Sequence, residues 1–195
     1  MRKLLALTLL LCVLTGVSAA DDFGQSYERF QTLYAENVDF INQNTGRHLL
    51  PQSFSGAFDG EGDRIYVLSS GALDVEIKLD DLAEQIAYCR ITLTAPSGMS
   101  FGDSAHHDFT TSGYHSYALL MAMSKAQTAV ERYALVEEVN TGLAANAGAY
   151  ETQVGDYSLR CTSQNGAAVM LFENELLMST GMETTEEAPV IEIKE

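Results

Sequence analysis

Residues 113–142 read GYHSYALLMAMSKAQTAVERYALVEEVNTG, and this stretch predicts one long helix at the centre of a small domain. Residues 110–112 precede it and can supply an N-cap, and Gly142 can end it in the left-handed conformation. One stripe is apolar at helical spacing and consists of Leu119, Met123, Ala126, Val130 and Tyr133. The opposite side is mostly polar and consists of Lys125, Thr128, Glu131, Arg132 and Glu138. We therefore expect one side of this helix to pack on an apolar layer.

The first twenty residues have the layout of a secretory signal peptide. Arg2 and Lys3 come first, an apolar run follows over residues 4–14, and small residues end at Ala19 and Ala20. The run is too short to cross a bilayer as a stable helix, so we expect cleavage after Ala19 or Ala20 rather than a membrane span. The predicted localisation is secreted, either periplasmic or extracellular, with no membrane insertion after cleavage.

Acidic residues far outnumber basic residues in this chain. It carries 27 Asp and Glu against 11 Lys and Arg, which gives a formal net charge of −16. Such a surface repels nucleic acid and anionic lipid, so neither is an expected partner. The charge suits solubility outside the cell, and a basic partner is the other explanation.

Cys89 and Cys161 are the two cysteines that remain after cleavage, because Cys12 lies in the apolar run of the signal. In an exported protein an even pair favours a disulfide, and two buried free thiols are the alternative. A bridge would close a loop of roughly 70 residues and would stabilise the fold by about 4 kcal/mol in the chain-entropy model.

Periodicity predicts a first helix and five strands besides the long helix. The helix is expected over residues 21–44, with an apolar stripe made by Tyr27, Phe30, Tyr34, Val38 and Ile41. The strands are expected over residues 65–68, 73–79, 86–94, 157–162 and 167–172. Loops are expected over residues 51–62 and 96–108, and an Asn-Gly turn joins the last two strands.

These elements predict one α+β domain over residues 21–178, in the order α-β-β-β-α-β-β, followed by an acidic flexible tail over residues 179–195. Strands joined by short turns favour a single antiparallel sheet of about five strands, with two amphipathic helices packed on one face. Each half contains a helix and a hairpin, so a duplicated helix-hairpin unit is one interpretation and two unrelated units are the other. The element order is similar to that of type III secretion chaperone-like domains and, more loosely, to that of the repeats of the β-lactamase-inhibitor protein. This likeness implies a fold and no function.

Four side chains before and within the long helix suggest a metal site. His106, His107 and Asp108 are followed by His115, and imidazole and carboxylate groups are ligands of zinc. The spacing matches no zinc signature, and a hydrogen-bonded niche near the helix start is the other interpretation of His115. A metal-dependent extracellular hydrolase centred on this cluster is the alternative function.

A second acidic segment, Asp59–Asp63, alternates acid and glycine as some calcium loops do. Arg64 stands where the glycine of the sharp turn should be, and Ser70 stands where the bidentate glutamate belongs. We therefore interpret the segment as a solvated turn.

The strand over residues 167–172 is apolar on both faces, unlike the other strands. We assign Met170 and Phe172 to the face that is polar on the neighbouring strands, where it carries Arg90, Thr92, Arg160 and Thr162. Met170, Phe172, Leu176 and Leu177 are therefore the candidate interface, either covered by other parts of the chain or open to a protein partner or a second copy. The leading function is a secreted, non-catalytic, protein-binding or self-associating domain, with no catalytic residue and no cofactor.

Overall fold

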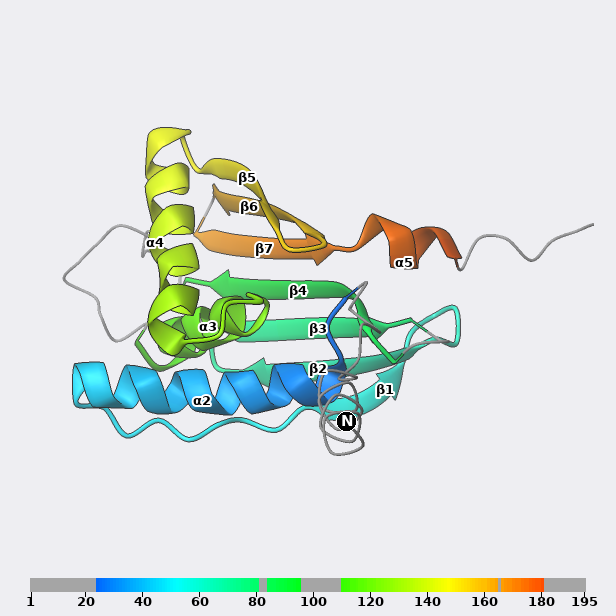
Figure 1. The fold of residues 1–195 in the computed structure, drawn as a ribbon, viewed down its shortest axis with the longest axis horizontal. Helices are drawn as coiled ribbons and strands as arrows, with labels where there is room; N and C mark the ends of the chain where they lie inside the picture. Colours follow the sequence, from blue (N-terminus) through cyan, green and yellow to red (C-terminus); the bar gives the residue numbers. More distant parts are fainter. Residues whose placement is uncertain (1–23, 81–83, 96–109, 165, 181–195) are drawn as a thin grey trace, which may run out of the picture.

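The computed structural model describes residues 24–80, 84–95, 110–164 and 166–180 (Figure 1). Its helices are α2 (Tyr27–Thr45), α3 (Thr110–Ala122), α4 (Ala129–Ala145) and α5 (Glu175–Thr180). Its strands are β1 (Ser55–Phe58), β2 (Arg64–Ser70), β3 (Leu73–Leu79), β4 (Ile86–Thr94), β5 (Ala149–Val154), β6 (Tyr157–Gln164) and β7 (Ala167–Glu173). The predicted signal peptide and the loop over residues 96–108 lie outside the described residues. The tail was predicted over residues 179–195, but residues 179 and 180 belong to α5 and the rest lies outside the described residues.

The strands form one antiparallel sheet in the order β1-β2-β3-β4-β7-β6-β5. Each half of the chain contributes a run of consecutive antiparallel strands, and the two runs meet where β4 pairs with β7. The α+β class and the single antiparallel sheet are therefore confirmed. The expected number of five strands is wrong, because β1 and β5 add one strand at each edge.

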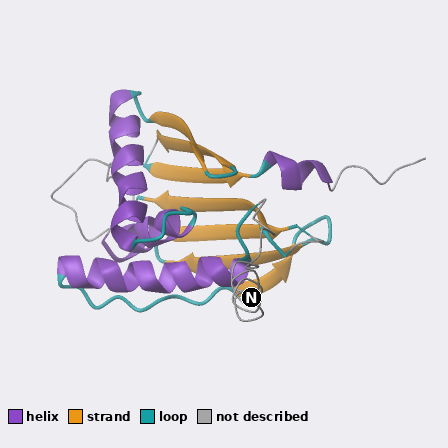
Figure 2. Ribbon diagram, viewed as in Figure 1, coloured by secondary structure: helices purple, strands orange, loops and turns teal. Residues whose placement is uncertain are grey.

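Three helices cover one face of the sheet. Figure 1 shows α2 beside β1 and β2, α3 over the middle strands, and α4 running across the strand ends near β5, β6 and β7. Tyr27 of α2 stacks on Tyr66 of β2 with ring centroids 3.8 Å apart, and Phe54 meets both Phe30 and Tyr34 edge-on. Figure 2 shows that α5 lies beyond the end of β7, apart from the other helices.

The first helix forms with the predicted apolar stripe and C-terminal end, but it begins at Tyr27 rather than at residue 21. Ser26 caps α2 by accepting a hydrogen bond at Oγ from the backbone N–H of Arg29, and Gly46 ends it with φ 69° in the left-handed region. The expected apolar stripe faces the sheet, and Phe30, Tyr34 and Val38 are buried.

The expected long helix is wrong, because the structure divides it into α3 and α4. Thr128 and Glu131 form a capping box, in which each side chain bonds to the backbone N–H of the other, and this starts a new helix. Because a new helix begins at Ala129, the residues of α4 that face the core differ from those of the predicted stripe. Val130 is 69% exposed and Tyr133 is 36% exposed, whereas Arg132 is only 2% exposed.

Candidate functional site

The two cysteines lie on the helix-covered face of the sheet as free, buried thiols. Cys89 pairs with Phe172 across β4 and β7, and Cys161 pairs with Met170 across β6 and β7. Strand β7 therefore separates them by two inter-strand spacings of about 4.8 Å each, beyond the roughly 7 Å between Cα atoms that a disulfide tolerates. The predicted disulfide is not formed, and the alternative of two buried thiols is correct.

Burial also makes both thiols unreactive. It raises the pKa of Cys161 to about 12 and raises the pKa of Cys89 well above its ordinary value. The thiolate is the nucleophilic form, so neither side chain is suited to covalent catalysis near neutral pH.

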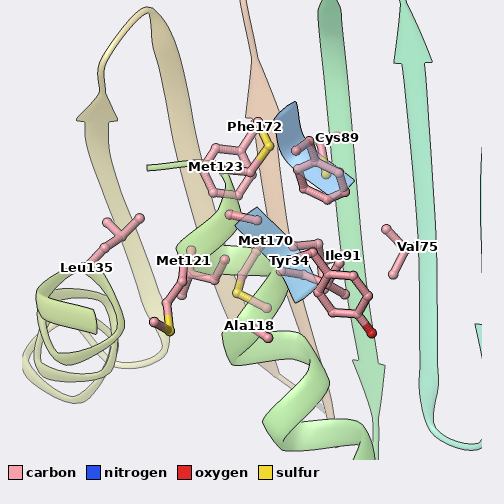
Figure 3. Close-up of a cluster of buried hydrophobic side chains, with 14 of the residues drawn as sticks. Tyr34, Val75, Cys89, Ile91, Ala118, Met121, Met123, Leu135, Met170 and Phe172 are labelled. Carbon is pink, nitrogen blue, oxygen red and sulfur yellow. The ribbon is translucent and has the colours of Figure 1, made fainter. Parts of the chain in front are cut away.

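Strand β7 is apolar on both faces, as predicted, but the assignment of its faces is inverted. Met170 is 7% exposed and Phe172 is fully buried, so both belong to the core. Their neighbours there, shown in Figure 3, include Cys89, Ile91, Met121 and Met123. Val169 and Leu171 point to the opposite side, where Leu171 pairs with Arg90 and Arg160. The candidate interface therefore cannot consist of Met170 and Phe172.

The face of the sheet opposite α2, α3 and α4 is called the open face below. It consists of the residues that alternate with the core positions along each strand. Its larger apolar members are Ile65, Val67, Tyr88, Val169 and Leu171. Its charged members are Asp74, Glu76, Lys78, Arg90, Glu151, Arg160 and Glu173. A purely solvated sheet face carries polar side chains, so the half-buried Val67, Val169 and Leu171 stand out.

One row of paired residues crosses this face from β2 to β5. In spatial order it reads Val67, Glu76, Arg90, Leu171, Arg160 and Glu151. A hollow of about 360 Å³ lies over its first half and is lined by residues of β2, β3 and β4, including Val67, Glu76 and Arg90.

The two arginines of the row differ in their partners. Arg160 forms an ion pair with Glu173 of the neighbouring strand. Arg90 forms no ion pair with any described residue, although Glu76 stands directly opposite it on β3. Glu76 is likewise without an ion pair among the described residues.

The other two members of the predicted interface lie in α5. Asn174 caps this short helix, because its Oδ1 accepts hydrogen bonds from the backbone N–H groups of Leu176 and Leu177. Leu176 is 58% exposed, and Leu177 is half-buried. Both lie past the end of β7 rather than within the open face.

Of the four predicted metal ligands, the described residues include only His115. Its ring is buried, and its Nδ1 lies 2.8 Å from the hydroxyl of Tyr34, which also accepts a hydrogen bond from the backbone N–H of Gln52. Burial lowers the pKa of His115, so its ring is neutral near pH 7. This is the hydrogen-bonded niche of the alternative interpretation, whereas His106, His107 and Asp108 lie outside the described residues.

Three carboxylates converge in the turn between β1 and β2, at Asp59, Glu61 and Asp63. The ammonium of Lys78 forms ion pairs with all three, at 3.3 Å from Asp59 and 3.6 Å from Glu61, with Asp63 closest. Asp59 also accepts backbone N–H bonds from Asp63 and Glu61, which together with Lys78 lower the pKa of its carboxyl. The single positive charge of Lys78 offsets one of the three negative charges, so the turn remains acidic.

A buried arginine is the most important polar residue that the sequence reasoning missed. Arg132 was expected on the solvent side, yet its guanidinium reaches Asn37 and Glu36 of α2 and the carbonyl oxygen of Gln127. The available signal was the capping motif Thr128-x-x-Glu131, because it starts a new helix. In this helix, position 132 lies on the same buried side as Leu135 and Val139.

A cleft of about 330 Å³ lies between α3, α4 and the strand ends. Its lining includes Leu120, Val139, Leu143 and Met170, and no acidic or basic side chain of the described residues borders it. The hydroxyl of Ser116, which also lines it, already donates to the carbonyl oxygen of Gly113. The cleft therefore offers mainly apolar packing, together with neutral polar groups such as the hydroxyl of Tyr117.

Comparisons with protein-family profiles, with curated proteins and with solved structures find no match to this chain. In the described part of the chain, no helix combines the length and the apolar character needed to cross a membrane.

Proposed function

We propose that this protein is an exported, non-catalytic domain that binds a protein through the open face of its sheet. Export is inferred from the signal-like first twenty residues. The observation that carries the binding role is the position of Leu171, an apolar residue next to the middle strand of that face, between Arg90 and Arg160.

The composition of the open face supports this role. Interfaces are enriched in aromatic residues and arginine at their centres, and Tyr88, Arg90 and Arg160 surround Leu171 on the neighbouring strands. The helix-covered face is occupied by the core, so the open face is the large surface of the sheet that can receive a partner.

A non-catalytic role is favoured by the state of the reactive side chains. The thiols of Cys89 and Cys161 are buried and protonated, and the imidazole of His115 is bonded to Tyr34. A thiol nucleophile needs a neighbouring base or a lowered pKa, whereas burial raises the pKa of both cysteines. The surroundings of His115 therefore do not support the alternative function, a metal-dependent hydrolase.

A pair of matched substitutions tests the proposal. Leu171→Asp places a charge within the open face, and Val130→Asp places the same charge at an exposed apolar site on the helix layer. We expect Leu171→Asp to abolish association with a copy or a partner, measured by sedimentation velocity, and Val130→Asp to leave it unchanged. Loss of association in Val130→Asp alone would move the binding surface to the helices and contradict the proposal.

A further inference from the structure

We infer that the occupant of the open face is a second copy of this chain, related by a two-fold axis that runs along the strands between β3 and β4. This inference rests on the proposed function and names its partner. Three properties of the open face support it, namely its charge balance, the order of its central row and its area.

The charge balance of the open face permits contact between two strongly acidic molecules. The chain carries a formal net charge of −16, so two copies repel each other through most of their surfaces. The central row of the open face carries two basic side chains, Arg90 and Arg160, and two acidic side chains, Glu76 and Glu151, which leaves this row neutral. A partner with the same row therefore meets no net repulsion there.

The central row is complementary to itself about an axis between β3 and β4. Glu76 and Arg90 stand on either side of that axis, and they form no ion pair with each other or with another described residue. A two-fold rotation about the axis places each Arg90 against Glu76 of the other copy, which creates two equivalent ion pairs. Residues next to the axis are also the least displaced by the angle at which two packed sheets cross.

The same rotation brings apolar groups together. Leu171 lies one strand beyond Arg90, and Val67 lies one strand beyond Glu76, so each Leu171 faces Val67 of the other copy. Val67 borders the hollow in the open face, which can receive the leucine side chain. An axis centred on β7 would instead place Arg90 against Arg160 of the other copy, and these like charges repel.

The area of the face is sufficient for a specific dimer. Three strands on each side of the axis face strands of the other copy, and six strands at a spacing of about 4.8 Å, each about 20 Å long, give a face of roughly 600 Å². Two such faces bury roughly 1,200 Å² in total, which reaches the lower limit of specific protein interfaces.

Charge exchange between two variants tests this arrangement. Arg90→Glu alone puts carboxylates against each other at the axis, and Glu76→Arg alone does the same with arginines. We expect each variant alone to dimerise at least roughly tenfold more weakly than the wild type in sedimentation velocity. An equimolar mixture of the two variants restores both ion pairs, so its sedimentation should return to that of a dimer.

Arg29→Glu in α2 and Glu137→Arg in α4 are the matched controls, because they make the same charge changes at exposed positions of the helix layer, away from the open face. Each should remain dimeric alone, with circular dichroism confirming the fold of all four variants. A mixture of Arg90→Glu and Glu76→Arg that stays monomeric would overturn the inference.

A wild type that is monomeric at every concentration would also overturn the inference, and would leave a different protein or residues 181–195 as the occupant. If Leu171→Asp then abolished a complex with a different protein, the proposed function would stand without the dimer. If Leu171→Asp abolished no association of any kind, the proposed function would fail as well.

Discussion

Arg132 of α4 donates a hydrogen bond from Nε to Oδ1 of Asn37 of α2 over 2.8 Å, and both side chains are buried. Asn37 in turn donates from Nδ2 to the carbonyl oxygen of Ala118 in α3. A single pair of polar side chains therefore ties three helices together. The guanidinium of Arg132 also forms an ion pair with Glu36, whose side chain is 55% exposed.

This pair predicts strong coupling in a double-mutant cycle. Arg132→Met and Asn37→Leu should each lower the free energy of unfolding by roughly 2–4 kcal/mol, because each leaves a buried polar partner unsatisfied. The double variant should lose clearly less than the sum of the two, measured by urea denaturation. Glu36→Ala is the control and should cost less than about 1 kcal/mol, since its carboxylate is largely exposed. Additive losses would show that the hydrogen bond does not link the helices.

The two thiols predict a specific chemical behaviour. A thiol reagent should fail to label the folded protein and should label Cys89 and Cys161 once the protein is denatured, without any reductant. An intact mass that is two hydrogens short, with no labelling in denaturant, would instead demonstrate a disulfide and would contradict the separation of the two strands by β7.

The raised thiol pKa values also predict a loss of stability in alkali. Above the ordinary cysteine pKa of about 8.5, the unfolded chain releases thiol protons that the folded chain retains, so the free energy of unfolding falls as pH rises. Each thiol contributes a slope of up to roughly 1.4 kcal/mol per pH unit between that value and its pKa in the folded state, which for Cys161 is about 12. A Cys89→Ala, Cys161→Ala double variant should show a shallower decline between pH 8 and pH 10. Parallel curves for the two proteins would exclude buried, protonated thiols.

Two helical glycines predict opposite effects of alanine. A Cβ at Gly142 would lie 2.2 Å from Cδ2 of the Tyr150 ring, whereas a Cβ at Gly113 meets nothing within 4 Å. Gly142→Ala should therefore destabilise the fold by about 1–3 kcal/mol, and Gly113→Ala should stabilise it by about 0.5–1 kcal/mol through helix propensity. Thermal unfolding measures both, and a stabilised Gly142→Ala variant would show that α4 does not pack on Tyr150.

The sequence was most informative where one face of an element is buried and the other is solvated. The stripe of α2 and the alternation of β3 and β4 predicted those elements and their buried sides. Strand β1 was missed because its side chains are mostly exposed and show no such pattern. Strand β5 was missed although Tyr150, Thr152 and Val154 alternate with more exposed residues, because its inner side carries only one fully buried residue. Gly142 was taken as a helix end, although α4 continues to Ala145.

The inverted face of β7 had a physical cause and a signal that was not used. An apolar residue at every position gives no indication of which side is buried, and a shift of one residue exchanges the two sides. The Asn-Gly turn nevertheless fixes the pairing, because Gln164 opposite Ala167 places Met170 beside Cys161. Since Cys161 was expected to face the core, Met170 follows it there.

The central claim is that the open face of the sheet, which includes Leu171, is the surface through which the protein associates. Comparing Met170→Asp with Leu171→Asp by circular dichroism and sedimentation velocity tests it most directly. The account predicts that Met170→Asp unfolds the protein, because its charge enters the core, while Leu171→Asp stays folded and becomes monomeric. A folded Met170→Asp variant, or a Leu171→Asp variant that associates as the wild type does, would contradict it.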